Sequence, residues 1–153
     1  TIYNGECVKI SSGYVVGGNG SAANIVGVLN GIFFNAADTL KPTFSNFYKA
    51  TITPANSEDT TAFVIDDPFQ QYVVAADAAT GVATFLETYD MNTSAGSDTT
   101  GKSSSTLDIG TTSANDKQFR MLRSAEDPEN EDATAVRHSV IVVSNQNSFN
   151  GHN

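Results

Sequence analysis

The chain has 153 residues, 39% of them hydrophobic and 9% aromatic, which excludes a disordered composition and predicts one domain with its own core. Seventeen Asp and Glu residues outnumber eight Lys and Arg residues, so the formal net charge is -9. Nucleic acids and anionic membranes both require a basic surface, and we therefore expect neither as a partner. No apolar run in the sequence reaches the ~20 residues of a membrane-spanning helix.

Cys7 is the only cysteine, so no disulfide forms within the chain. We interpret it as a small buried hydrophobic residue, because nothing in the sequence supports a catalytic pairing with His138 or His152. The first ten residues lack the basic stretch and long apolar run of a signal peptide. Since the sequence starts at Thr1, we expect either a processed chain or a preceding N-terminal piece.

Residues 5–18, GECVKISSGYVVGG, predict two short strands joined by a turn. Apolar and polar residues alternate before Ser-Ser-Gly, and a second apolar run follows at 14–16. Such runs, bounded by Gly, Ser and Asn, are typical of a β-hairpin. The following GGNG, residues 17–20, predicts a tight turn, because the lysine and helix of a phosphate-binding loop do not follow it.

Residues 25–34, IVGVLNGIFF, are strongly apolar but contain two glycines at a four-residue spacing. The run is too short to span a membrane, and a helix would carry both glycines at a cost of about 1 kcal/mol each. Its β-branched and aromatic residues favour a buried, bent strand in which Gly27, Leu29 and Gly31 share one face. Glycines in such a strand mark a bulge, a bend or a close backbone approach. The alternative is a turn at Asn30-Gly31 that splits the segment in two.

Two stretches are predicted to be long connections. Residues 35–60 are polar, with aromatic anchors at Phe44, Phe47 and Tyr48. Residues 91–116 are rich in Ser, Thr and Gly, which predicts either a flexible linker or an ordered loop with isolated strand-like residues. We expect this second stretch to be a long loop within the domain.

The remaining segments also read mainly as strands. Residues 60–77 predict two strands around a turn at Asp66-Asp67-Pro68, whereas residues 78–90 are ambiguous between a short helix and a strand, with a slight preference for the strand. A strand in KQFRMLRS precedes an acidic loop at 126–132 and a strong terminal strand over 136–143. Many short strands without a long amphipathic helix predict an all-β, or mostly β, domain over residues 1–153. We expect a small β-barrel or a sandwich-like or tulip-like domain with long loops.

Candidate catalytic and metal-binding groups are weak in this sequence. Asp66 and Asp67 are neighbours, and neighbouring strand residues point to opposite faces, so a turn is a better interpretation than an acid–base pair. The acidic run EDPENED at 126–132 lacks the glycine of a calcium loop and predicts a solvated surface loop. His138 stands alone at a strand start and predicts a packed or surface residue rather than a zinc ligand. We therefore predict no catalytic residue, metal site or cofactor.

Six segments, in order, resemble a known family. They are NGECVKI, IVGVLNGIFF, KPTFSNFY, AFVIDDPFQQYVV, QFRMLRSAEDPEN and VRHSVIVVSNQ, which together extend from about residue 3 to residue 146. This order and spacing resembles the capsid decoration, or cement, proteins of tailed bacteriophages, common in marine and cyanobacterial phages with HK97-like heads. The VIDDP turn and the KPTFSNFY segment carry most of the similarity, while residues 91–116 match mainly in composition. The terminal SNQNSFNGHN departs from the family's usual Asn-Glu-His type of ending.

The resemblance implies a structural, non-enzymatic protein of the virion, on the outer surface of the capsid. Its partners would be the major capsid protein, with the HK97-like fold, and further copies of itself in a homotrimer. Phe44, Phe47 and Tyr48 are candidate contacts with these partners, although plugging one end of a barrel suits them equally well. Tyr3 belongs to an N-terminal stretch that either adds a strand to a neighbour or forms an ordinary first strand. Phe149, in the polar tail, is a further candidate beside the alternative of a frayed end.

Two other functions remain open from the sequence. One is a tail or fibre component or a carbohydrate-binding β module, although the absence of Trp argues mildly against a sugar platform. The other is a hydrolase whose Asp and His residues converge only in the fold. In the second case, substitution of Asp67 or His138 would remove activity without unfolding the chain.

Overall fold

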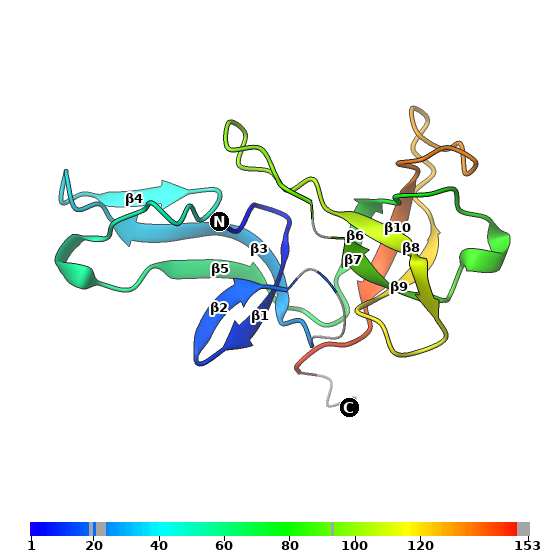
Figure 1. The fold of residues 1–153 in the computed structure, drawn as a ribbon, viewed down its shortest axis with the longest axis horizontal. Helices are drawn as coiled ribbons and strands as arrows, with labels where there is room; N and C mark the ends of the chain where they lie inside the picture. Colours follow the sequence, from blue (N-terminus) through cyan, green and yellow to red (C-terminus); the bar gives the residue numbers. More distant parts are fainter. Residues whose placement is uncertain (19, 21–23, 93, 150–153) are drawn as a thin grey trace.

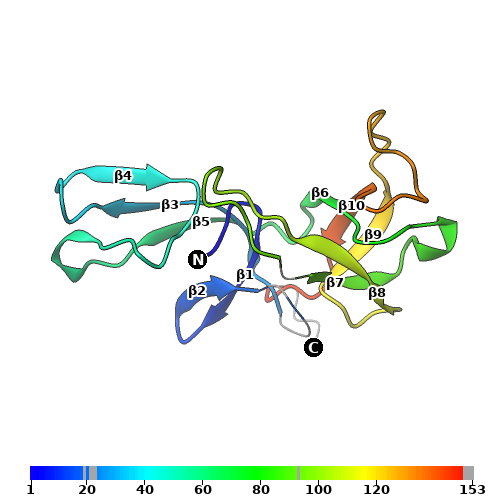
Figure 2. The ribbon, with the colours of Figure 1, turned by 45° about the horizontal axis from the view of Figure 1, so that its top comes forward.

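The all-β prediction is confirmed by the computed structural model, which describes residues 1–18, 20, 24–92 and 94–149. Within these residues, strands form two antiparallel sheets that lie side by side along the long axis of the molecule (Figures 1 and 2). Two short 3-10 helices, η1 (Ala55–Ser57) and η2 (Val82–Thr84), interrupt the connections. The molecule is therefore elongated, with one lobe for each sheet.

The first sheet has the strand order β2-β1-β3-β4, and β5 pairs with the other edge of β3. Its strands are β1 (Cys7–Ser11), β2 (Tyr14–Gly17), β3 (Gly27–Asn35), β4 (Pro42–Ser45) and β5 (Thr61–Ile65). The second sheet has the order β6-β10-β9-β7-β8. Its strands are β6 (Gln71–Ala75), β7 (Thr88–Asn92), β8 (Thr106–Ser113), β9 (Phe119–Ser124) and β10 (Ser139–Ser144).

The predicted hairpin at residues 5–18 is confirmed by the pairing of β1 with β2. The two strands predicted within 60–77 are also present as β5 and β6, but they belong to different sheets. The Asp66-Asp67-Pro68 turn therefore connects the lobes instead of closing a hairpin. The GGNG turn falls partly outside the described residues, because Asn19 is not among them.

The long connections contain more strand than predicted. Residues 42–45 of the expected 35–60 connection form β4, which pairs with β3. The ambiguous segment 78–90 contains both η2 and the start of β7. Within 91–116, β8 takes residues 106–113, so the described part of the loop proper is the segment 94–105, which we call the strap. Cross-strand pairing thus overrides the polar composition of these segments.

Each lobe has its own apolar cluster. In the first lobe Val8, Leu29, Ile32 and Phe34 are buried together. In the second lobe the cluster is larger and lies mainly on β7, β9 and β10. Cys7 and Ile25, from the N-terminal part of the chain, belong to this second cluster, with 2% and 1% of their surfaces exposed. The lobes are therefore joined by shared packing as well as by chain connections.

The strap runs from the second lobe to the first (Figures 1 and 2). Asn4 donates its backbone N–H to Gly101 O at 2.8 Å and accepts from Ser103 N–H at 2.9 Å. The Asn46 side chain donates to Thr100 O at 2.7 Å. These contacts make the Ser/Thr/Gly-rich segment an ordered loop, which was one of the two alternatives that its composition left open.

The bent strand predicted at residues 25–34 is β3, and both of its glycines have a packing reason. A Cβ atom at Gly27 would lie 2.0 Å from the carbonyl oxygen of Ile65 on β5. Gly31 has a φ of +123°, and its pairing with β5 is irregular between Leu29 and Ile32. The strand continues through this irregularity, so the alternative of a turn at Asn30-Gly31 is wrong. A bulge bends the strand, as expected for glycine in a sheet.

The bulge also changes which residues face inward. Before it, Gly27 and Leu29 are buried, as a period of two requires. After it, Ile32 and Phe34 are the inward pair, while Phe33 is 38% exposed. One extra residue therefore shifts the alternation by one position, which a strict period of two did not predict.

Substitution of Gly27 by alanine tests the close approach of β3 and β5. The added methyl group meets the Ile65 carbonyl and the Val64 side chain, and we expect a loss of about 3 kcal/mol in the free energy of unfolding. Gly81→Ala is the matched control, because no atom lies within 4 Å of its added Cβ and its φ of -144° suits any residue. Its stability should stay the same or rise by up to about 1 kcal/mol. Urea unfolding measures both, and equal stabilities would contradict the packing argument.

Candidate interaction surface

The Asp66-Asp67 pair forms a turn. The Asp67 carboxylate accepts the backbone N–H of Phe69 at 2.8 Å, and its carbonyl accepts that of Gln70 at 3.1 Å. This is the local capping that Asp supplies in turns. Both aspartates are exposed, and among the described residues neither belongs to a group of three or more His, Cys, Asp or Glu side chains that could hold a metal ion. The geometry favours the turn interpretation over acid–base chemistry.

The acidic loop at 126–132 caps its own backbone. Asp127 accepts the N–H of Glu129 at 3.1 Å, and Asp132 accepts both the hydroxyl and the N–H of Thr134, at 2.6 and 2.9 Å. The hydrogen bonds from Thr134 hold the pKa of Asp132 below its ordinary value. Across the described residues, no group of three or more His, Cys, Asp or Glu side chains is arranged to hold a metal ion.

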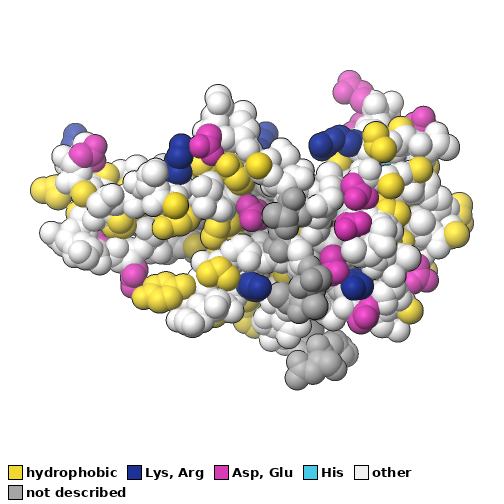
Figure 3. Space-filling view, viewed as in Figure 1, with side chains coloured by type: hydrophobic (Ala, Val, Ile, Leu, Met, Phe, Trp, Pro, Cys, Tyr) yellow, Lys and Arg dark blue, Asp and Glu magenta, His cyan; other side chains and the backbone are white. Residues whose placement is uncertain are grey.

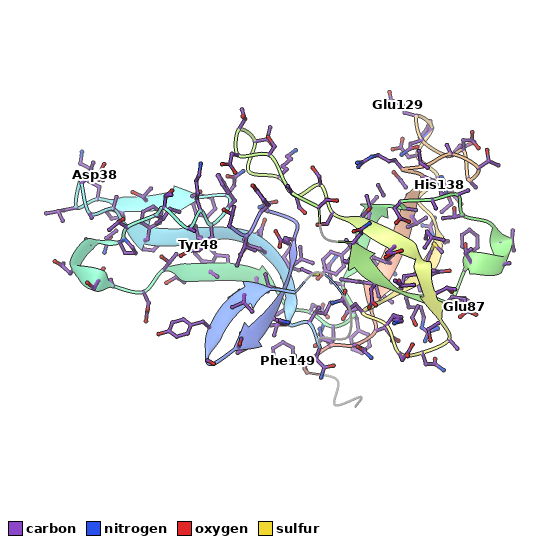
Figure 4. All side chains as sticks on the ribbon, viewed as in Figure 1. Asp38, Tyr48, Glu87, Glu129, His138 and Phe149 are labelled. Carbon is purple, nitrogen blue, oxygen red and sulfur yellow. The ribbon has the colours of Figure 1, made fainter. Side chains whose placement is uncertain are left out.

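His138 is fully buried at the base of this acidic loop, below Glu129 in Figure 4. Its Nδ1 lies 3.1 Å from the carbonyl oxygen of Asn130, while its backbone carbonyl accepts the N–H of Ala76. It therefore packs the loop against the second lobe, one of the two positions that the sequence predicted. Burial also raises the pKa of the Cys7 thiol to about 12, which disfavours the nucleophilic thiolate. His152 lies outside the described residues.

Two of the five predicted contact residues, Tyr3 and Phe47, stack on each other. Their ring centroids are 5.7 Å apart with an interplanar angle of 7°. The Tyr3 hydroxyl donates to Asp98 of the strap at 2.8 Å, and Lys49 forms an ion pair with the same carboxylate at 2.7 Å. The Lys49 ammonium and the Tyr3 hydroxyl hold the pKa of Asp98 below its ordinary value. Tyr3 and Phe47 thus have an internal role in fastening the strap.

The other three predicted residues occupy different environments. Tyr48 is partly buried against the first-lobe cluster, and its backbone pairs with that of Ile2 (Figure 4). Phe149 is 61% exposed near the C-terminal end of the described chain (Figure 4). Phe44 is 63% exposed on β4. The structure therefore does not bring the five residues together into one surface.

Phe44 instead lies beside exposed apolar residues that were not among the predicted contact residues. Phe33 pairs directly with Phe44 across β3 and β4, and the Phe44 and Phe63 rings are 6.0 Å apart. Ile65 follows on the same face of β5 as Phe63. We call these four side chains the outer patch: Phe33, Phe44, Phe63 and Ile65, which are 38%, 63%, 45% and 37% exposed. The alternation within β5 was visible in the sequence, but its placement beside Phe44 depends on non-local pairing.

Gly31 provides the space for this patch. A Cβ atom at Gly31 would lie 2.6 Å from Cζ of the Phe44 ring. The missing side chain at Gly31 therefore lets the ring lie against the backbone of β3, near the Phe63 ring. The same local distortion that bends the strand also seats the most exposed aromatic residue of the patch.

The outer patch has an uncharged centre and a mainly acidic surround. Strands β3, β4 and β5 contain no Asp, Glu, Lys or Arg, although the chain has 25 such residues. Asp66 and Asp67 follow β5, and Lys41 precedes β4. Acidic side chains also spread over the second lobe (Figure 3). An apolar centre with a charged rim is the usual composition of a protein–protein interface.

Comparison with known proteins gives no further guide to this surface: no protein-family model, curated protein or solved structure matches the chain. None of the helices in the described residues is long and apolar enough to cross a membrane. Function must therefore be inferred from the residues and their geometry.

Substitution of Asp67 by alanine separates the turn from a catalytic role. The Phe69 N–H loses its partner, and we expect the free energy of unfolding to fall by about 1 kcal/mol. Asp66→Ala is the matched control, with an expected change within about 0.5 kcal/mol. Thermal unfolding of the two variants measures the difference. Loss of a hydrolytic activity in Asp67→Ala at unchanged stability would contradict the turn interpretation.

Proposed function

We propose that the protein is a structural component of a tailed-phage virion that binds the outside of the head and cements neighbouring major capsid protein subunits. The outer patch carries this proposal, because four clustered apolar side chains on uncharged strands favour a protein partner. The order of sequence segments from about residue 3 to residue 146 supports an HK97-like capsid as that partner. A role as a tail or fibre component is the alternative.

The charge of the chain supports a partner with a complementary surface. The rim of the outer patch is mainly acidic, and the whole chain carries a net charge of -9. A capsid surface with an apolar depression and basic surroundings would match both features. Two copies meeting patch to patch would instead bring acidic rims together. We therefore assign the patch to the coat protein and expect the contacts within a homotrimer to use other surfaces.

Such a protein stabilises the shell by binding across subunit seams. DNA packed inside the head exerts pressure outward, and a bridging subunit adds buried area where neighbouring coat subunits would otherwise separate. Binding to the expanded lattice alone favours that lattice by mass action. Many copies on one particle provide avidity without tight individual contacts. An elongated molecule with two joined lobes suits contact with more than one subunit.

The decisive experiment is the copy number of this chain in purified particles, measured against the major capsid protein by quantitative mass spectrometry. A ratio near one to one, or a simple fraction of it, would support the cement role. A handful of copies would instead support a tail or vertex component. Complete absence from particles would overturn the proposal.

Substitution of Phe44 by serine tests the outer patch directly. Loss of an exposed aromatic anchor should weaken binding to heads that lack the protein by about tenfold or more, because central aromatic residues dominate interface energetics. Co-sedimentation with such heads, followed by quantification of the bound protein, measures the effect. Val82→Ser is the matched control, since Val82 is 85% exposed on η2 in the other lobe. Equal binding by the two variants would place the contact elsewhere.

A further inference from the structure

The first lobe contains a groove on the side of the sheet opposite the outer patch. Its volume is about 840 Å³, and its floor includes Leu29, Ile32 and Ala62. By strand alternation these residues face away from Phe33 and Phe63, which belong to the outer patch. The groove is therefore a separate feature, and it opens onto the apolar cluster of the first lobe.

Two unpaired strand edges border this groove. Among the described strands, β2 pairs only with β1, and β5 pairs only with β3. The groove is lined by every residue from Gly13 to Gly17, and on the other side by Glu58, Asp59 and Thr60. Since successive side chains point to opposite faces, lining by consecutive residues indicates that the groove follows the edge of β2. In Figures 1 and 2, the β1–β2 hairpin lies beneath β5.

The first sheet thus resembles a barrel that lacks one strand. Its order across β3 is β2-β1-β3-β5, and the two outer strands of this series face a common space. Unpaired N–H and C=O groups along such edges are a template for an added strand. Backbone pairing provides affinity in this kind of recognition, while alternate side chains fill apolar pockets.

The charges around the groove indicate which type of added strand it would favour. Glu58 and Asp59 line it, and none of its lining residues is Lys or Arg. Asn35 donates its side-chain amide to one oxygen of Glu58 at 3.0 Å, which positions this carboxylate at the wall. Glu58 and Asp59 are both exposed to solvent at the rim of the groove. A segment with basic residues between its apolar ones therefore fits better than a neutral or acidic one.

We propose that this groove binds an extended segment of a partner protein, apolar at alternate positions and carrying Lys or Arg between them, which pairs with the free edge of β2. The four residues of β2 provide pairing over about 13 Å at the usual rise of a strand. The alternate apolar side chains of the segment pack against Val15, Val16 and Ala62, which are partly exposed in the groove lining, and its basic side chains meet Glu58 and Asp59. This proposal does not depend on attachment to a phage head.

The test uses a capped synthetic peptide of about nine residues, with valine at alternate positions and lysine and threonine between them. Titration into the isotopically labelled protein should shift the backbone amide signals of residues 13–17 and 58–62. A peptide with glutamate in place of lysine should bind at least about tenfold more weakly. A scrambled peptide of the same composition, which breaks the alternation, should not shift these signals.

Variants that remove charge but keep side-chain shape test whether the carboxylates determine the preference for a basic peptide. The double substitution Glu58→Gln and Asp59→Asn keeps the side-chain shapes and an acceptor for Asn35, so the fold should persist. The affinity ratio between the lysine and glutamate peptides should then fall toward one. Phe44→Ser, on the opposite face of the sheet, should leave peptide binding unchanged, which keeps this test distinct from that of the outer patch. Absence of shifts at 13–17, or equal binding of both peptides by the unaltered protein, would overturn the proposal.

Discussion

The buried carboxamide of Gln118 is the interaction on which the joining of the two lobes depends. The side chain has no exposed surface, and its amide donates to the carbonyls of Gly18 and Gly20 at 2.6 and 3.2 Å. Its oxygen accepts the N–H of Met91 at 3.0 Å, while its backbone carbonyl accepts from Asn145 and Gln146. One residue thus connects the end of the first hairpin, the second sheet and the C-terminal segment. Buried polar groups without hydrogen-bond partners would lower the stability of the fold. These contacts therefore fix the relative position of the three segments.

Aromatic and hydrogen-bonded contacts secure the lobes at a second point. Tyr3 and Phe47 stack in the first lobe, and the Tyr3 hydroxyl reaches Asp98 on the strap. A Cβ atom at Gly96 would lie 2.4 Å from the Tyr3 ring, so glycine allows the strap to pass close to the stack. The two connections therefore use different segments of the first lobe.

Local patterns in the sequence predicted most of the strands but not their partners. The β1–β2 hairpin and the glycines of β3 could be recognised because turns, alternation and steric requirements are local properties. The crossing of the chain between β5 and β6 and the incorporation of Ile25 into the second cluster depend on distant residues. For the same reason Phe44 could be selected as an exposed aromatic, whereas Tyr3 and Phe47 could not be recognised as an internal stack. Gln118, which immediately precedes β9, could not be recognised, because a single glutamine is usually a surface residue.

The hydrogen bond between Gln118 and Gly18 joins residues 100 positions apart, and this has a consequence for how the chain folds. The second cluster stays incomplete until Cys7 and Ile25 arrive from the beginning of the chain, although most of its strands come from the latter half. The second lobe is therefore not a self-sufficient folding unit, and the transition between unfolded and native chains should be a single cooperative event. Closure of so long a loop must precede much of the stabilisation, which places the protein among the slow-folding β topologies.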